Sequence, residues 1–143
     1  MLGYWKQKEL TDKAMHKGWM KTGDGAKMDK DGYVFIVDRV KDMIISGGEN
    51  ISSIEVENAL YSHPAVVCAA VVAMPDEKWG EVPCAFVELA EGSEVCEVDL
   101  IEHARGQLAG FKRPKRIVFE ALPKTTTGKI RKNLLRERVA DLV

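Results

Sequence analysis

Three stretches of the chain are almost wholly apolar and rich in residues that favour β-strands. Residues 66–73 form a continuous apolar run, residues 82–89 form a second after a loop at 75–80, and residues 116–119 form a third. Strands that are apolar on both faces are typical of a sheet that is covered on both sides. The pattern therefore predicts three strands in one small sheet, with helices packed against it.

Helical spacing of apolar residues marks three further segments. Residues 52–61 begin with Ser-Ser-Ile-Glu, which has the form of a capping box. Residues 94–108 are amphipathic and carry acids at their N-terminal end, where the helix dipole favours them. Residues 132–139 form a last short helix. Because strands and helices interleave, the predicted fold class is α+β: a small mixed sheet of about three strands flanked by helices.

The N-terminal part of the chain has a different pattern. Residues 25–37 predict a β-hairpin, because the turn sequence Asp-Lys-Asp-Gly precedes a run of β-forming residues. The charged stretch 38–42 then separates this hairpin from the apolar residues beyond it. We therefore predict a boundary near Lys41, which divides the chain into segments 1–40 and 41–143.

Composition is that of an ordinary globular protein, with 45% hydrophobic and 30% charged residues in 143. No apolar run is long enough to span a bilayer, and the N-terminus shows no signal-peptide pattern, so we expect a cytoplasmic protein without a membrane span. The C-terminal Asp-Leu-Val is not a peroxisomal signal of the Ser-Lys-Leu type. Three cysteines and three histidines lack the spacing of metal ligands, so we expect no metal site and buried thiols at Cys68 and Cys84.

Charge is distributed unevenly along the chain. Residues 1–104 carry 10 Lys/Arg and 19 Asp/Glu, a net charge of −9, whereas residues 105–143 carry 11 and 3, a net charge of +8. A basic segment can bind an anion such as phosphate, a nucleotide or nucleic acid. It can equally be a solvated basic face, which composition alone favours.

The run Pro123–Lys129, with the sequence Pro-Lys-Thr-Thr-Thr-Gly-Lys, is the first candidate for chemistry. It is not a Walker A loop, because proline stands in place of the first glycine and isoleucine follows the lysine. What remains is a loop that presents one ammonium group, a compact charge suited to phosphate or carboxylate oxygens. Taken alone, a basic surface loop explains it better.

Two more segments could contact a ligand. Ser46-Gly47-Gly48 precedes a helix, and paired glycines let a backbone approach a ligand closely or adopt positive φ. Asp24 follows a glycine, and a single carboxylate can accept hydrogen bonds from two vicinal hydroxyls, as in ribose recognition. Each of these features is unremarkable in isolation.

Together and in this order, the segments closely resemble the C-terminal region of the AMP-forming acyl-CoA synthetases, within the superfamily of adenylate-forming ligases. The resemblance covers essentially the whole chain and rests on five stretches: Gly3–Trp5, Trp19–Asp24, Asp38–Glu57, Trp79–Glu81 and Pro123–Lys129. It implies that residues 1–40 are the tail end of a large N-terminal domain and 41–143 a mobile C-terminal domain. The missing N-terminal domain would be its partner, and this chain alone would form no adenylate.

The resemblance also implies a two-step reaction and gives roles to named residues. In the first step a carboxylic acid and ATP with Mg²⁺ form an acyl-adenylate and pyrophosphate. Asp24 falls on the family's ribose-binding aspartate, Arg39 on an arginine that contacts the nucleotide, and Lys129 on the catalytic lysine that bridges carboxylate and α-phosphate. ATP and coenzyme A would be co-substrates of the full-length enzyme, with neither held tightly by this fragment.

In the second step coenzyme A displaces AMP and a thioester forms. The resemblance places Lys41 at the hinge about which the C-terminal domain rotates between the steps. The loop that lines the pantetheine tunnel would be formed by Gly47, Gly48, Glu49 and Asn50. Ile45 stands where luciferase-like members carry lysine, which argues against light-emitting chemistry, and Asn50 stands where some acyl-CoA synthetases carry arginine.

Three alternatives remain open from the residues. The chain could belong to an adenylation domain that loads a carrier protein, or it could be a non-catalytic module that binds anions or nucleic acid through residues 105–143. It could also be a truncated product with an interaction role. The sequence of residues 41–57 resembles that of synthetases that act on fatty or small carboxylic acids. The residues that select the acid lie outside this chain.

Overall fold

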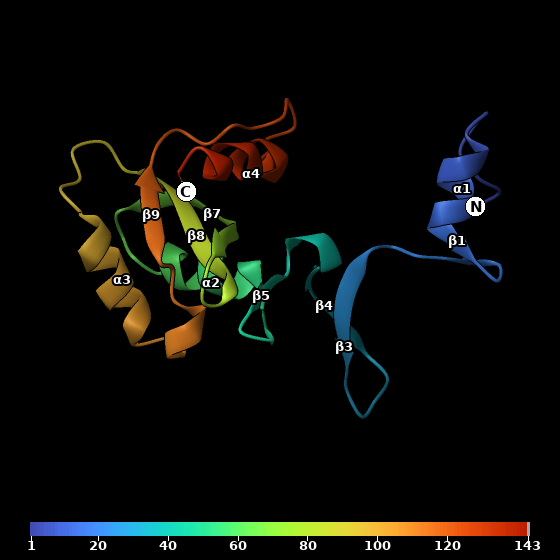
Figure 1. Cartoon of the computed structure of the whole chain (residues 1–143), viewed down its shortest axis with the longest axis horizontal. Helices are drawn as coiled ribbons and strands as arrows, with labels where there is room; N and C mark the ends of the chain where they lie inside the picture. Colours follow the sequence, from blue (N-terminus) through green and yellow to red (C-terminus); the bar gives the residue numbers. More distant parts are fainter. Residues whose placement is uncertain (143) are drawn as a thin grey trace. The chain divides into compact units, whose positions relative to one another are not determined.

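The computed structural model describes residues 1–142. The chain divides into two compact units, Met1–Lys41 and a second unit that begins at Asp42 (Figure 1). The division falls within a short 3-10 helix, η1 (Val40–Asp42). Among the described residues, no helix has the length and apolar character that crossing a membrane requires.

The first unit consists of a short helix and two hairpins. Helix α1 (Lys8–Ala14) leads into the short strands β1 (Met15–His16) and β2 (Trp19–Met20), which pair with each other. Strands β3 (Asp24–Met28) and β4 (Val34–Arg39) form the second hairpin. This pairing confirms the hairpin predicted over 25–37.

The second hairpin leaves most of its apolar side chains in water. Met28 is 72% exposed, Tyr33 69% and Ile36 63%, and no apolar residue of 1–41 is buried. A lone two-stranded hairpin is marginally stable in water. Exposed apolar surface of this extent is typical of a site that contacts another protein surface. Because none of its apolar residues is buried, the first unit has no hydrophobic core of its own.

The second unit is built on one five-stranded sheet. Its strands lie in the order β6-β5-β8-β7, with β9 paired to β8, and their bounds are β5 (Ile44–Ser46), β6 (Glu49–Ile51), β7 (Val66–Asp76), β8 (Gly80–Leu89) and β9 (Arg116–Phe119). Strands β8 and β9 are parallel and the other pairs antiparallel. The sheet is mixed, as predicted, but has five strands instead of about three. The two extra strands are short and join β8 through the single pair Ser46–Gly80.

The central hairpin is longer than the sequence predicts. The sequence predicts a loop over 75–80, but the ladder continues through the pairs Pro75–Glu81 and Asp76–Gly80. Only residues 77–79 make the turn. The Asp76 carboxylate stabilises it by accepting hydrogen bonds from the N–H groups of Lys78 (2.9 Å) and Trp79 (2.8 Å). This longer ladder fixes the position of Trp79.

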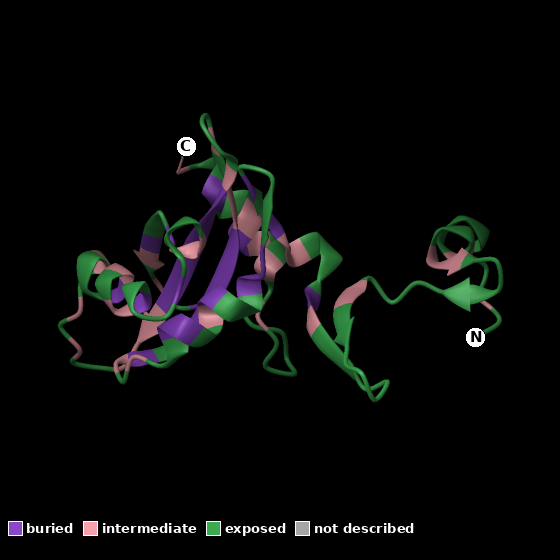
Figure 2. Cartoon of the chain, turned by 90° about the horizontal axis from the view of Figure 1, so that it is seen from below, coloured by how far each residue is buried: buried purple, intermediate pink, exposed green. Residues whose placement is uncertain are grey.

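Helices cover both faces of the sheet. Helices α2 (Ser53–Tyr61) and α3 (Glu97–Arg105) pack on one face, and α4 (Lys132–Ala140) packs on the other. The buried residues of Figure 2 follow the sheet and the helix faces turned toward it. Residues of β7 alternate between the two layers, since Ala69 and Val71 belong to the first core and Ala70 and Val72 to the second. This alternation explains the continuous apolar run in the sequence.

Helix α3 is shorter than the predicted segment 94–108, because Cys96 caps it and Gly106 ends it. Two of the cysteines, Cys68 and Cys84, are buried in the core beneath α4, as expected. Burial raises the pKa of the Cys84 thiol to about 11, which keeps it protonated and unreactive near neutral pH.

We predict that Leu135→Ala destabilises the second unit by about 2–5 kcal/mol, because Leu135 is fully buried between α4 and the sheet. The matched control is Val98→Ala on α3, whose side chain is 71% exposed. That variant should change the free energy of unfolding by less than about 0.5 kcal/mol. Urea denaturation of the two variants measures the difference. Equal effects would show that α4 does not pack as described.

Candidate functional site

The lysine loop, residues 123–131, is a tight hairpin that precedes α4. Lys124 and Ile130 form an isolated antiparallel bridge at its base. At the tip, the N–H of Gly128 bonds the carbonyl of Thr125 (2.9 Å), and Gly128 has a φ of 82°. A turn followed by a glycine in the left-handed region is a common way to close a short hairpin. The glycine in Thr-Thr-Thr-Gly-Lys is therefore needed for the turn.

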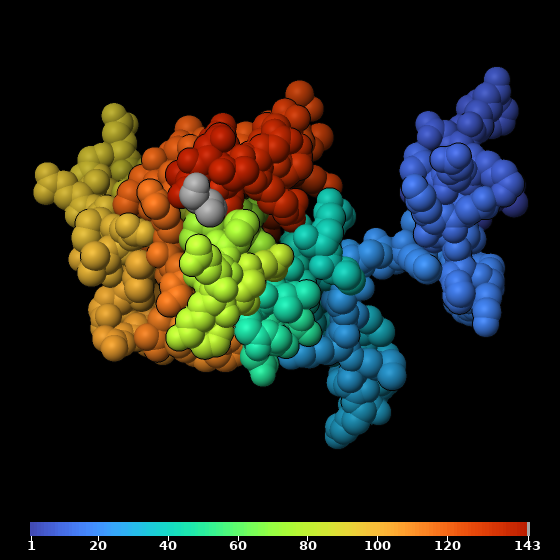
Figure 3. Space-filling model, in the orientation of Figure 1, coloured from blue at the N-terminus to red at the C-terminus, as the bar shows by residue number. Residues whose placement is uncertain are grey.

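The threonines give the lysine loop internal order. The hydroxyl of Thr125 accepts a hydrogen bond from the N–H of Lys129 (3.1 Å) and lies 2.9 Å from the hydroxyl of Thr127. The N–H of Thr125 donates to the carbonyl of Lys129 (2.8 Å). These bonds fix the backbone of Lys129 and leave its side chain exposed. Figure 3 shows this orange segment at the surface beside the red α4.

Two lysines that flank Lys129 are paired. Lys124 Nζ lies 2.9 Å from Glu88 Oε2, and Lys132 Nζ lies 2.6 Å from Glu57 Oε1. The hydrogen bond from Lys124 holds the pKa of Glu88 below its usual range, and the same bond raises the pKa of Lys124. Within residues 1–142, by contrast, the ammonium of Lys129 has no hydrogen bond or ion pair. The loop therefore offers the uncommitted ammonium of Lys129 near its tip and the exposed guanidinium of Arg131 at its base.

The glycine turn, Gly47-Gly48, joins β5 to β6. Both residues have positive φ, 58° and 86°, which is the geometry of a two-residue hairpin turn. The N–H of Gly47 donates to the carbonyl of Trp79 (2.8 Å). A Cβ at Gly47 would lie 2.8 Å from the Trp79 ring, whereas a Cβ at Gly48 would meet nothing within 4 Å. Gly47 thus packs on the indole, and Gly48 faces open space.

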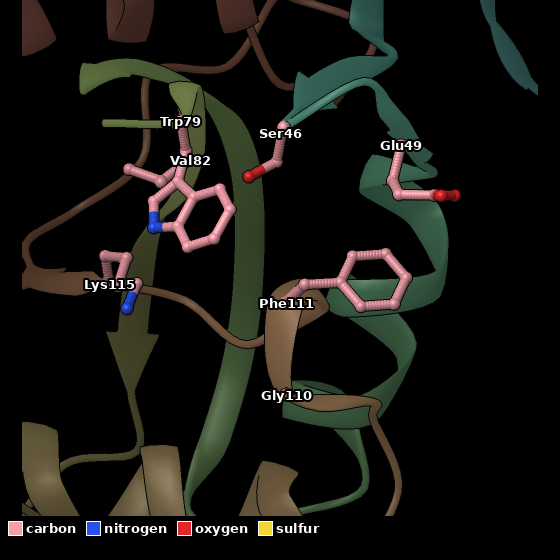
Figure 4. Close-up of a pocket in the computed structure, with 8 residues that line it drawn as sticks. Ser46, Glu49, Trp79, Val82, Gly110, Phe111 and Lys115 are labelled. Carbon is pink, nitrogen blue, oxygen red and sulfur yellow. The ribbon is translucent and has the colours of Figure 1, made fainter. Parts of the chain in front are cut away.

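A groove of about 360 Å³ lies next to the glycine turn (Figure 4). It is lined by Ser46, Gly47, Glu49, Trp79, Val82, Gly110, Phe111 and Lys115. The close-up shows the rings of Trp79 and Phe111 on two sides of it, with the side chain of Lys115 on the Trp79 side. Apolar rings with a cation nearby can take a ligand that has both an aromatic or apolar part and anionic groups.

Phe111 and Lys115 were not predicted from the sequence as site residues. Both belong to the stretch that ends the 94–108 helix and leads into β9, around the 3-10 helix η2 (Gly110–Lys112). Lys112 Nζ holds η2 against α2 through an ion pair with Glu55 (2.7 Å). The only signal in the sequence was the clustering of basic residues at 112–116 beside an aromatic residue. Asn50, which was predicted, does not line the groove and pairs with Ile45 in the β5–β6 ladder.

Asp24 and Arg39 are neighbours in the first unit. They are register partners across β3 and β4, and Arg39 Nε lies 3.6 Å from Asp24 Oδ1. Both remain open to solvent, with side chains 26% and 61% exposed respectively. A second hollow, of about 350 Å³, is lined by Thr22, Gly23, Arg39, Val40 and Lys41. The pair predicted to contact a nucleotide is thus brought together by the hairpin.

Within the second unit, the lysine loop and the glycine turn are far apart. Figure 1 shows the orange lysine loop above α4, whereas the teal glycine turn lies at the end of β5, away from α4. The domain therefore presents two distinct surfaces, one with an ammonium and one with a glycine backbone and an aromatic groove.

Comparison with known proteins shows which family this chain belongs to. Residues 55–129 match the model of the AMP-binding enzyme C-terminal domain. The chain belongs to this family. It is 54% identical, over 96% of its length, to a peroxisomal trans-cinnamate:CoA ligase of Petunia hybrida and spans 24% of that protein. It is 55% identical, over 96% of its length, to the 2-methylpropanoate–CoA ligase CCL4 of Humulus lupulus and spans 25% of it.

The fold also agrees with that of a solved structure. ATP-bound MatB from Rhodopseudomonas palustris superposes with a TM-score of 0.89 at 39% identity, covering 98% of this chain and 28% of that one. The match confirms the α+β fold class. The chain thus spans about a quarter of the length of the relatives it matches.

We predict that Gly47→Ala costs more stability than Gly48→Ala. Both variants place a side chain at positive φ, which costs roughly 1–2 kcal/mol. Only Gly47→Ala also forces a Cβ against the Trp79 ring. Urea denaturation, followed by far-UV circular dichroism, should therefore show a larger loss of unfolding free energy for Gly47→Ala. Equal losses would contradict the packing of Gly47 on Trp79.

We also predict that the Glu88–Lys124 pair contributes stability that is lost in acid. Because the folded-state pKa of Glu88 is lowered, its contribution is present above the unfolded pKa of about 4.3 and disappears as pH falls through the folded value. The difference in unfolding free energy between wild type and Glu88→Gln should be constant at neutral pH and shrink below about pH 4.3. Denaturation from pH 7 to 3 measures it, and a difference that grows in acid would be contradictory.

Proposed function

We propose that this chain is the C-terminal portion of an ATP-dependent, AMP-forming acid–CoA ligase. The reaction converts a fatty or small carboxylic acid, ATP and coenzyme A to acyl-CoA, AMP and pyrophosphate. The observation that carries the proposal is the exposed, uncommitted ammonium of Lys129 on an ordered loop whose neighbouring lysines, Lys124 and Lys132, are paired. The relatives, which are named as CoA ligases, support coenzyme A as the thiol.

In the first step, Lys129 is the catalytic residue. Attack of the acid's carboxylate on the α-phosphate gathers negative charge on the phosphate oxygens, and a positioned cation stabilises that charge. Hydrogen bonds from and to Thr125 hold the Lys129 backbone, so the ammonium is the main moving part. Asp24 would accept hydrogen bonds from the ribose hydroxyls of ATP, and Arg39 beside it would contact the nucleotide. Mg²⁺ would arrive with the ATP.

In the second step, the glycine turn and its groove bind coenzyme A. A narrow pantetheine chain can pass close to a backbone that has no side chains, as at Gly48, where nothing lies within 4 Å of a Cβ position. Glu49, the residue after Gly48, lines the groove. The rings of Trp79 and Phe111 and the ammonium of Lys115 suit the apolar and phosphate-bearing parts of the cofactor. Asn50 would contribute by its pairing with Ile45, which holds the β5–β6 hairpin together.

Rotation about Lys41 would exchange the two surfaces. The lysine loop must move away from the α-phosphate before the thiol of coenzyme A can approach the carbonyl carbon of the acyl-adenylate. A rigid domain can make this exchange by turning about a hinge. Lys41 lies in η1, where the two compact units divide. The separate placement of the lysine loop and glycine turn supports this exchange.

The N-terminal part of the ligase completes the enzyme. The exposed apolar side chains of β3 and β4 would pack against it, and it would supply the pocket for the acid. The chain alone is then inactive. A cytoplasmic location is also part of the proposal, although the Petunia relative is named as peroxisomal.

Two other functions receive less support. A carrier-protein thiol could replace coenzyme A, and binding of coenzyme A by the full-length ligase would decide between them. A nucleic-acid module would need available cations in 105–143, but several of these pair with carboxylates, as in Lys112–Glu55, Lys124–Glu88 and Arg138–Glu120.

The test is Lys129→Ala in a full-length fusion, in which residues 1–143 replace the matched region of the Humulus 2-methylpropanoate–CoA ligase. Formation of 2-methylpropanoyl-AMP should fall by roughly 10²–10³-fold, because the variant lacks the positive charge that stabilises the negative charge developing on the α-phosphate oxygens. Thioester formation from supplied acyl-AMP should stay within about threefold of wild type, because Lys129 has left the site by then. Pyrophosphate release and acyl-CoA formation measure the two steps.

The control is Arg105→Ala, which removes an exposed cation of α3 that pairs with Glu102. It should leave both steps unchanged. Full adenylation by Lys129→Ala, or an equal loss in both steps, would contradict the proposal that Lys129 acts in the first step only.

A further inference from the structure

We infer that Glu57 and Lys132 form a positioning pair that aims Lys129 at its substrate. Lys132 Nζ lies 2.6 Å from Glu57 Oε1, and the two side chains are only 18% and 14% exposed. An ion pair so little exposed is screened less by water than a surface pair, and breaking it strands a charge. The inference rests on the proposed function of Lys129.

Each member of the pair has a further partner. Lys132 Nζ donates a hydrogen bond to Ser53 Oγ (2.8 Å), and Glu57 Oε1 accepts one from the N–H of Val71 (2.8 Å). Val71 is fully buried in β7, whose outer edge has no neighbouring strand in the described sheet. The carboxylate therefore satisfies a strand-edge N–H and a lysine together. Such a network tolerates little displacement of the lysine.

The pair joins elements that lie on opposite faces of the sheet. Glu57 belongs to α2, in the first core layer, and Lys132 is the first residue of α4, in the second. Lys132 stands only three residues after Lys129. Fixing the first residue of α4 against α2 and β7 therefore fixes the strand of the lysine loop that carries Lys129.

The other strand of the loop is fixed separately. Glu88 accepts hydrogen bonds from the ammonium of Lys124 (2.9 Å) and the N–H of Leu122 (3.5 Å). This second anchor is more exposed, with side chains 39% and 31% accessible. The Glu57–Lys132 pair is less exposed and directly follows the strand that carries Lys129, so it should have the larger effect on the position of the ammonium. Misplacing a catalytic group by about 1 Å can cost on the order of 10²-fold in rate.

The test uses the Humulus fusion with Glu57→Gln and Lys132→Met. Each should lower the rate of acyl-AMP formation by about 10–100-fold at saturating ATP, because Lys129 is present but misaimed. The KM for ATP and the rate of thioester formation from supplied acyl-AMP should change by less than about threefold. Lys132→Arg should recover most of the adenylation rate, since it restores the ion pair. The double variant should be no worse than either single one, because the two residues act as one unit.

The matched control is Glu102→Gln, which removes an exposed carboxylate that pairs with Arg105 on α3. It should leave both steps unchanged. Circular dichroism confirms that each variant is folded at the assay temperature. If Glu57→Gln unfolds, Lys132→Met decides, since it leaves the Glu57–Val71 hydrogen bond in place.

Three results would overturn the inference. The first is normal adenylation by Glu57→Gln and Lys132→Met in a fusion where Lys129→Ala lowers adenylation as predicted, which leaves the proposed function intact. The second is an equal loss of both steps, which would make the pair merely structural. The third is full adenylation by Lys129→Ala itself, which would remove the proposed function and the inference together.

Discussion

The structure depends on one constraint, the need to bury both faces of the β7–β8 hairpin. Side chains of β7 alternate between two cores, so neither face can be left to water. Helices α2 and α3 cover one face and α4 covers the other, and α4 must therefore cross from β9 to the far side of the sheet. The lysine loop is the connection that makes this crossing. Its place on the surface follows from the packing of the core.

The same constraint separates the two chemically interesting loops. The glycine turn belongs to β5 and β6, which pack against α2 in the first core, whereas the lysine loop leads into the helix of the second core. A small domain thus carries a cation on one side and an open backbone beside an aromatic groove on the other. The Glu57–Lys132 pair links the two layers at the edge of β7 next to the lysine loop, and the bond from the N–H of Gly47 to the carbonyl of Trp79 holds the glycine turn against the sheet.

Much of this could be predicted from local sequence. The strand at 116–119 and the start of α2 at the Ser52 cap follow from composition and capping, and Ser52 does accept a hydrogen bond from the N–H of Glu55 (3.4 Å). The carboxylate of Glu55 pairs with Lys112 far along the chain, which no local pattern indicates. The groove was missed for the same reason. Its walls come from Ser46, Trp79 and Phe111, and only the fold brings these together.

The central claim is that the two surfaces serve different half-reactions of one ligase. The most direct measurement compares two variants of the full-length fusion, Lys129→Ala and Gly48→Leu, in acyl-AMP formation and in thioester formation from supplied acyl-AMP. The account predicts mirrored defects: Lys129→Ala loses the first step only, and Gly48→Leu, whose side chain enters open space beside the groove, loses the second only. Loss of the same step in both variants would contradict it.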